Sequence, residues 1–165
     1  MTGAQAAVAL AILALAFLAW FWLAPGGVLA LRRRAGGDLQ VDVRAGYGPA
    51  TLYRLLEQYG PDGRAGFRRM LLIDMAFPLV YGTLLYLLAA LFGAPQRPVA
   101  AVAQEAAVLA ALCDYAENAL LLAGLDRLPR RADGTARLAG LATTFKMLAF
   151  LLAVAALLLA WSGVL

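Results

Sequence analysis

Four long apolar stretches constrain this chain more than any other feature. They cover residues 5–24, 70–92, 98–125 and 138–161. Each stretch can cross ~30 Å of hydrocarbon as a helix that rises about 1.5 Å per residue. Backbone amides find no water partner in hydrocarbon, so a helix is the conformation that satisfies them. The sequence therefore predicts an all-α integral membrane protein, with four transmembrane helices in an up-down bundle.

The composition agrees with a single membrane domain over residues 1–165. Hydrophobic residues make up 64% of the chain and charged residues 15%, whereas a soluble domain is nearer half apolar. The first stretch is expected to stay in the protein as a helix, because no basic residue precedes it and it is longer than the apolar core of a signal peptide. We find no internal repeat and no separate soluble domain.

The distribution of the arginines predicts the orientation of the bundle in the membrane. Residues 32–69 hold eight arginines and residues 126–137 hold four, whereas the connection near residues 93–99 holds only Arg97. The positive-inside rule then makes both arginine-rich loops cytoplasmic and both termini external, in a bacterial-type inner membrane. A second interpretation is attraction to anionic lipid headgroups or a phosphorylated ligand, at ~1 kcal/mol for each basic residue near the surface. No nucleic-acid motif accompanies these arginines, so we expect membrane lipids as partners and no nucleic acid.

Missing residue types exclude several kinds of chemistry. The chain has no histidine and one cysteine, Cys113. The chain therefore lacks the residues needed for intrachain disulfides, His/Cys zinc sites, haem ligation, iron–sulfur clusters and histidine-based catalytic triads. An oxygen-ligated Mg²⁺ would need three carboxylates such as Asp74, Asp114 and Glu117, and the nearby Lys146 argues against it. We expect no metal and no cofactor.

The long loop at residues 32–69 carries two local patterns. Alternation in "DLQVDVR", residues 38–44, predicts a short extended segment. Leu52, Leu55, Leu56 and Tyr59 recur with the spacing of one helical face and predict a short amphipathic cytoplasmic helix at about 49–59, ended by Gly60. This helix could lie on the membrane surface, cap the mouth of the bundle, or serve only as a linker.

Polar residues interrupt the third apolar stretch near its cytoplasmic end. Asp114, Glu117 and Asn118 share one helical face with small alanines. Small residues let another helix approach closely, which turns the polar side chains inward rather than into lipid.

The second and fourth stretches repeat this arrangement. Asp74 and Tyr81 share a face of the second helix, and Thr143 and Lys146 share an alanine-lined face of the fourth. All of these groups fall in the cytoplasmic leaflet, so we expect one polar cluster that opens toward the cytoplasm. A charge inside a membrane costs ~3 kcal/mol even on lenient scales, which favours pairing between Lys146 and a carboxylate.

The predicted site divides into two sets of residues. The candidate catalytic or ionisable centre is Asp114, Glu117 and Lys146. The candidate ligand-binding groups are Asp74, Tyr81, Tyr115, Asn118 and Thr143.

The site predicts the binding or processing of a lipid-like or small amphipathic molecule, and it leaves open whether a reaction is catalysed. Two alternatives remain open. One is a small proton-coupled transporter, which would need a polar path to both sides of the membrane. The other is a structural or assembly subunit, in which the polar cluster only holds the helices in register.

Overall fold

All the regular structure that the computed structural model describes, in residues 2–92 and 98–162, is helical. The long helices are α1 (Gly3–Leu23), α3 (Pro49–Asp74), α4 (Phe77–Phe92), α5 (Pro98–Asp126) and α6 (Asp133–Ser162). Two shorter elements, α2 (Val28–Arg34) and the single 3₁₀ turn η1 (Val41–Val43), lie between α1 and α3. Among the described residues, four helical segments are long and apolar enough to cross a membrane. Most of the expected connection near residues 93–99, Arg97 included, lies outside the described residues.

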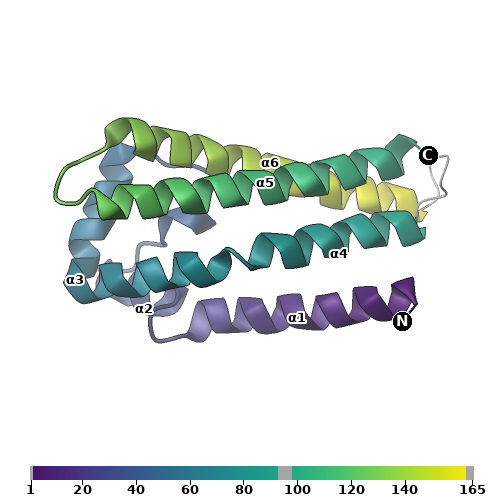
Figure 1. Ribbon diagram of the computed structural model, residues 1–165, viewed down its shortest axis with the longest axis horizontal. Coiled ribbons are helices and arrows are strands. Elements are labelled where there is room, and N and C mark those ends of the chain that lie inside the picture. The colour runs from purple at the N-terminus through teal and green to yellow at the C-terminus, as the bar shows by residue number, and fades with distance from the viewer. Residues whose placement is uncertain (1, 93–97, 163–165) are drawn as a thin grey trace.

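The long helices pack side by side into a bundle (Figure 1). α5 contacts α6 along much of its length, α4 lies against α5, and α1 rests mainly on α4. The first residues of α1 and the last described residues of α6 lie at the same end, here called the distal end. α2, the start of α3 and the turn between α5 and α6 lie at the other end.

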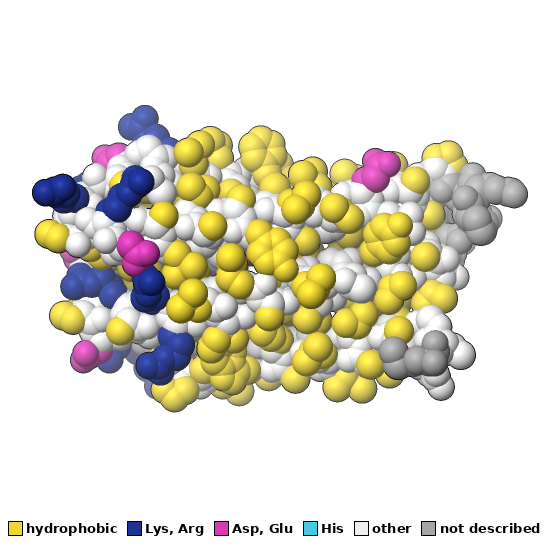
Figure 2. Space-filling view, in the orientation of Figure 1, with side chains coloured by type: hydrophobic (Ala, Val, Ile, Leu, Met, Phe, Trp, Pro, Cys, Tyr) yellow, Lys and Arg dark blue, Asp and Glu magenta, His cyan; other side chains and the backbone are white. Residues whose placement is uncertain are grey.

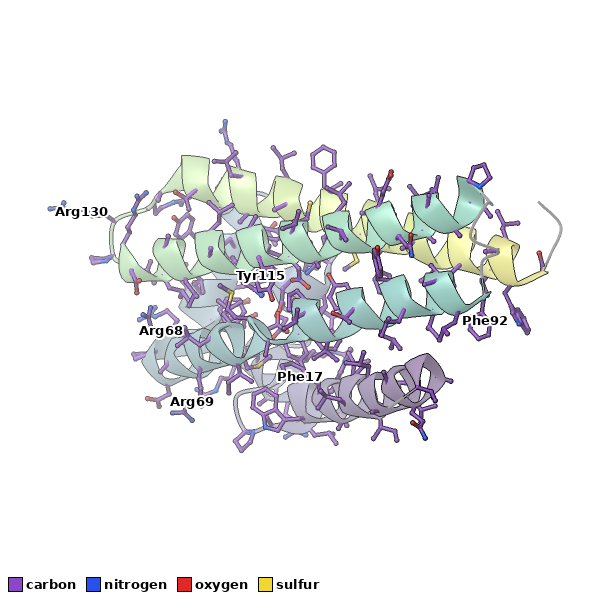
Figure 3. All side chains as sticks on the ribbon, turned by 45° about the vertical axis from the view of Figure 1, so that its right-hand side comes forward. Phe17, Arg68, Arg69, Phe92, Tyr115 and Arg130 are labelled. Carbon is purple, nitrogen blue, oxygen red and sulfur yellow. The ribbon has the colours of Figure 1, made fainter. Side chains whose placement is uncertain are left out.

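Arginines gather at that second end, here called the arginine end. Figure 2 shows the basic side chains collected there, while apolar side chains cover most of the remaining visible face. In Figure 3, Arg68, Arg69 and Arg130 lie at this end and Phe92 lies at the opposite one. The separation of charge from apolar surface thus follows the long axis of the bundle.

Alanine dominates the contacts of the distal half. Small clusters join Ala89 of α4, Ala103 of α5 and Ala156 of α6, and then Ala106 and Ala107 of α5 with Ala153 of α6. Small side chains let helix backbones approach closely, which increases van der Waals contact between the helices.

A core of larger side chains fills the arginine half. Its buried members come from α1, α2, η1, α3, α5 and α6, and they include Leu31, Val41, Tyr59, Phe67 and Leu121. The apolar stripe of the predicted amphipathic helix belongs to this core, because Leu52, Leu55, Leu56 and Tyr59 are all buried. The start of α3 therefore packs against the rest of the protein with its apolar face.

Gly60, where the amphipathic helix is predicted to end, is the residue at which α3 is kinked and two helical segments meet. Gly60 adopts φ 65° and ψ −178°, and the helix resumes at once and runs to Asp74. Glycine reaches a positive φ without the steric penalty of a Cβ. Pro61 then suits a first helical turn, because its missing N–H would have no partner there. The second apolar stretch accordingly enters the bundle from a helix that starts well before residue 70.

The same stretch is also broken inside the bundle, although its apolar length predicts one helix over 70–92. α3 ends at Asp74 and α4 begins at Phe77. Pro78 explains the break, because its ring collides with the carbonyl of the residue four positions earlier, Asp74, and it has no N–H to donate to that carbonyl. The break therefore sits beside one of the predicted site residues.

Residues 38–44 do not form the predicted extended segment. Val41–Val43 form a 3₁₀ turn, Val41 enters the core, and the chain then runs along α6. The hydroxyl of Thr144 donates to the carbonyl oxygen of Ala45 at 3.3 Å. A Cβ at Gly140 would collide with the carbonyl of Tyr47, so the absent side chain admits this segment. Burial of Val41 thus determines the conformation of this segment, although its alternating pattern predicts an extended one. The described residues contain no strand with which the segment could pair.

Candidate functional site

Lys146 of α6 is the centre of the predicted polar cluster. Its Nζ atom lies 2.5 Å from Oε2 of Glu117 and 3.2 Å from Oδ1 of Asp114, both on α5. Nζ also donates to the backbone oxygen of Asp42 at 3.2 Å. The side chain of Lys146 is 12% exposed, so these contacts replace most of the hydration of its ammonium group.

Glu117 is fully buried and is held from two sides. Its Oε2 pairs with Lys146, while its Oε1 lies 2.5 Å from the hydroxyl of Thr143, the expected binding group on α6. The same hydroxyl lies 3.0 Å from the backbone oxygen of Ala139. A hydroxyl group has one proton to donate. Thr143 therefore donates to Glu117 when Glu117 is ionised, and to the backbone oxygen of Ala139 when Glu117 is protonated.

Asp74 joins the cluster from the end of α3. The side-chain amide of Asn118 donates to its Oδ2 at 2.8 Å, and both residues are buried. Tyr81 of α4 is buried beside Asp114, although its hydroxyl has no hydrogen-bond partner of ordinary geometry among the described residues. Residues predicted from three separate stretches thus meet at one level of the bundle.

Asp42 is a member of the cluster that sequence reasoning missed. It lies in the 3₁₀ turn, outside every predicted span, and it is 6% exposed. The side-chain amide of Gln40 donates to its Oδ2 at 2.9 Å, whereas its Oδ1 has no partner among the described residues. Burial and the nearby Glu117 carboxylate raise the pKa of Asp42 well above its usual range, although Lys146 acts in the opposite direction. Its place inside "DLQVDVR" carries no signal of burial, because the pattern resembles an ordinary polar loop.

Tyr115 does not join these residues. It is half-buried on another side of α5, where it lines an apolar groove with Gly82, Tyr86 and other residues of α4 and α5. Its neighbour Asp114 points to the cluster, and adjacent residues on a helix diverge by about 100°. The predicted hydrogen-bonding role of Tyr115 is therefore not supported by its position.

The assembled polar cluster is defined by seven residues. They are Asp42, Asp74, Asp114, Glu117, Asn118, Thr143 and Lys146.

Acidic groups outnumber the base in this cluster. It contains four carboxyl groups and a single ammonium group, and every carboxyl-bearing residue is buried. An uncompensated charge in a low-dielectric interior is costly enough that a carboxyl group takes up a proton or finds a cation. The cluster can therefore hold protons, or accept a positive group from outside.

A cavity of about 130 Å³ opens onto one side of the cluster. Asp42, Asp74, Asp114 and Lys146 form its polar side. Its apolar side is formed by Leu18, Phe21, Trp22, Val43 and Phe77. The cavity thus brings charged and apolar groups together around one space.

This cavity reaches the side of the bundle rather than its arginine end, where the sequence predicts the opening. On each helix the residues one turn nearer the arginine end belong to the large core: Leu71 precedes Asp74, Leu121 follows Asn118 and Ala139 precedes Thr143. Leu18 and Trp22, on the cavity wall, are exposed on the lateral surface of α1. The core closes the end of the bundle, and the way out passes beside α1.

No group of three or more His, Cys, Asp or Glu residues arranged to hold a metal ion is found within residues 2–92 and 98–162. Lys146 lies among the carboxylates at the position where a cation would otherwise sit.

No family model, curated protein or solved structure matches the chain. What the site does must therefore follow from its own geometry.

Proposed function

We propose that this chain is a four-span membrane protein that binds a lipid-like or small amphipathic molecule within the bilayer. The polar end of that molecule meets the polar cluster, and its tail leaves the cavity beside α1. The single observation that carries the proposal is the cavity, because it joins buried charged groups to an apolar wall that continues to the lateral surface.

Membrane insertion is supported by the distribution of surface groups. Large apolar side chains are exposed along α1, α4, α5 and α6, whereas soluble monomers rarely expose large contiguous apolar patches. The helices run in an up-down order in this proposal. The arginine end faces the cytoplasm of a bacterial-type inner membrane and both termini face outside.

Ligand binding accounts for the site better than helix registration does. A network that serves only packing gains most when every buried group is satisfied and no space is left. Here Oδ1 of Asp42 lacks a hydrogen-bond partner among the described residues, and a cavity lies beside the cluster. A proton-coupled carrier is less well supported, because alanines fill the contacts between the cluster and the distal end.

The cavity can be tested by filling it. Leu18, 40% exposed, lines the cavity, and Leu15, 67% exposed, lies on the same helix facing outward. Native mass spectrometry of the wild-type chain, extracted in an uncharged detergent, should show a retained amphipathic molecule. Leu18→Trp should abolish that adduct, whereas Leu15→Trp should keep it. Equal retention in both variants would place the bound molecule elsewhere and contradict the proposal.

Orientation can be tested with single cysteines in a Cys113→Ser background. Arg130→Cys places a thiol at the arginine end and Thr2→Cys places one at the distal end. In intact cells, an impermeant maleimide should label Thr2→Cys and leave Arg130→Cys unlabelled until the cells are opened. The opposite pattern would invert the topology.

A further inference from the structure

We infer that the polar end of the bound molecule is an organic ammonium group, held at the carboxyl group of Asp42 and bordered by the rings of Phe21, Trp22 and Phe77. This inference rests on the proposed function and adds the charge of the ligand. It follows from three properties of the cavity.

The first property is that the charge of Lys146 is already paired. Its Nζ atom forms ion pairs with Asp114 and Glu117 and donates to the backbone oxygen of Asp42. Asp42 and Asp74 receive hydrogen bonds only from neutral amides, those of Gln40 and Asn118, and make no ion pair with any described residue. Two cavity-lining carboxyl groups thus lack a counter-charge.

The second property is an unsatisfied acceptor. Asp42 is 6% exposed and lines the cavity, and its Oδ1 accepts no hydrogen bond from the described residues. Leaving a buried acceptor unpaired is unfavourable, and more so for a charged one. A positive group that enters the cavity can displace the proton of Asp42 to solvent and offset the carboxylate left behind, whereas an anion would add to the repulsion.

The third property is the wall opposite the carboxyl groups. Phe21, Trp22 and Phe77 line the cavity, and aromatic faces attract organic cations while also suiting an apolar tail. The volume of about 130 Å³ is close to the ~150 Å³ of an engineered cavity that admits benzene. A compact ammonium group fits this space, while a sugar-phosphate headgroup is too large.

The test compares three probes with the same ten-carbon tail. The full chain is purified in dodecyl maltoside, which is uncharged, and binding of tritiated decylammonium is measured by scintillation proximity at neutral pH. Unlabelled decylammonium, decanol and decanoate then compete. We expect decylammonium to compete at a concentration at least about tenfold lower than decanol, because a charge-assisted contact is added to the same tail contacts. Decanoate should compete least.

Two variants separate the effect of the Asp42 charge on binding from the effect of its side-chain shape. Asp42→Asn keeps the size of the side chain and should weaken decylammonium binding about tenfold, with little effect on decanol. Glu105→Gln removes an exposed carboxylate from the distal part of α5 and should leave both unchanged. The wild-type probe series needs no variant, so the inference remains testable if Asp42→Asn does not fold.

The outcomes are distinguishable. Selectivity for decylammonium that Asp42→Asn removes, together with loss of decylammonium binding in Leu18→Trp, supports the inference. Equal competition by the three probes, or selectivity that survives Asp42→Asn, overturns the ammonium group and leaves the proposed amphipathic ligand in place. Decylammonium binding that Leu18→Trp leaves unchanged overturns the assignment to this cavity. Absence of decylammonium binding overturns the inference, whereas the proposed function is overturned separately, by native mass spectrometry that finds equal retention in Leu18→Trp and Leu15→Trp.

Discussion

The two halves of the bundle are built differently. In the distal half, alanines from α4, α5 and α6 meet in small clusters. In the arginine half, leucines, aromatic residues and valines from six elements form one large core. The polar cluster lies where the two kinds of packing meet. Close backbone approach leaves little room for a polar group, whereas elements held apart by large side chains leave space for charged groups and for a cavity.

The coverage of the cluster differs between its two sides as well. α5 and α6 pack closely behind it, while α1 and the turn at residues 41–43 cover its front. α1 contacts chiefly α4, where Phe17 stacks on Phe77 with ring centroids 4.9 Å apart. A binding site beneath the least embedded helix can admit a ligand without disturbing the α5–α6 pair.

The largest effect should follow from removing the one cation of the cluster. Lys146→Gln leaves Asp114 and Glu117 buried without their counter-charge, and loss of one partner from a buried ion pair costs about 3–5 kcal/mol. Thermal unfolding in detergent should show a strongly lowered midpoint. Adding Glu117→Gln to this variant should restore part of the loss. A midpoint within experimental error of wild type would mean that the cluster contributes no more to stability than the exposed surface does.

Leucine-to-alanine substitutions test whether the large core of the arginine half contributes more to stability than the surface does. Leu55 is fully buried in the arginine-half core, and Leu55→Ala should lower the free energy of unfolding by about 3 kcal/mol. Leu151 on α6 is exposed, and Leu151→Ala should cost less than about 0.5 kcal/mol. Chemical unfolding in micelles measures both. Equal losses of unfolding free energy in the two variants would show that a leucine in the arginine-half core stabilises the protein no more than an exposed leucine does.

The reverse change probes the distal half. Ala153 of α6 is buried against α5, and Ala153→Leu should force the two helices apart and cost about 1–3 kcal/mol. The polar cluster lies outside this contact, so ligand binding should survive in the folded fraction. If Ala153→Leu were neutral or stabilising, the distal contacts would be loose and the contrast between the halves would disappear.

The stability of the protein should also depend on pH through Asp42. Because its pKa is raised in the folded protein, the folded state binds the proton more tightly than the unfolded state, and its contribution to stability is greatest below the ordinary carboxyl pKa. That contribution declines as pH rises from there to the raised value. Glu117, Asp74 and Lys146 face the same group.

Comparison with a variant isolates Asp42 from these neighbours. Between pH 5 and pH 8, the stability of wild type should fall relative to that of Asp42→Asn. The relative loss is about 1.4 kcal/mol for every pH unit over which the folded protein keeps the Asp42 proton and the unfolded chain has released it. Unfolding midpoints measured across this pH range give the two curves. Parallel curves for the two proteins would mean that Asp42 titrates as an exposed carboxyl group does.

Much of the helical architecture could be predicted from single residues and their spacing. Apolar length alone predicts the long helices, and the faces that carry Asp74, Asp114, Glu117 and Lys146 converge in the structure as their spacing indicates. The two departures within the helices have local causes that were visible in the sequence, Gly60 and Pro78. Tyr115 was misplaced because it neighbours Asp114 on the chain while pointing to another side of the helix.

What the sequence determined by itself is the set of helices and the faces on which charge is confined, because both depend on periodicity and on the cost of exposing polar groups to hydrocarbon. Tertiary structure alone decided that Asp42 enters the cluster, and that the cavity opens beside α1 rather than through the arginine end. A turn such as Val41–Val43 is placed by distant packing, here the core around Val41 and the space left by Gly140. Such contacts join residues about a hundred positions apart, and no local pattern records them.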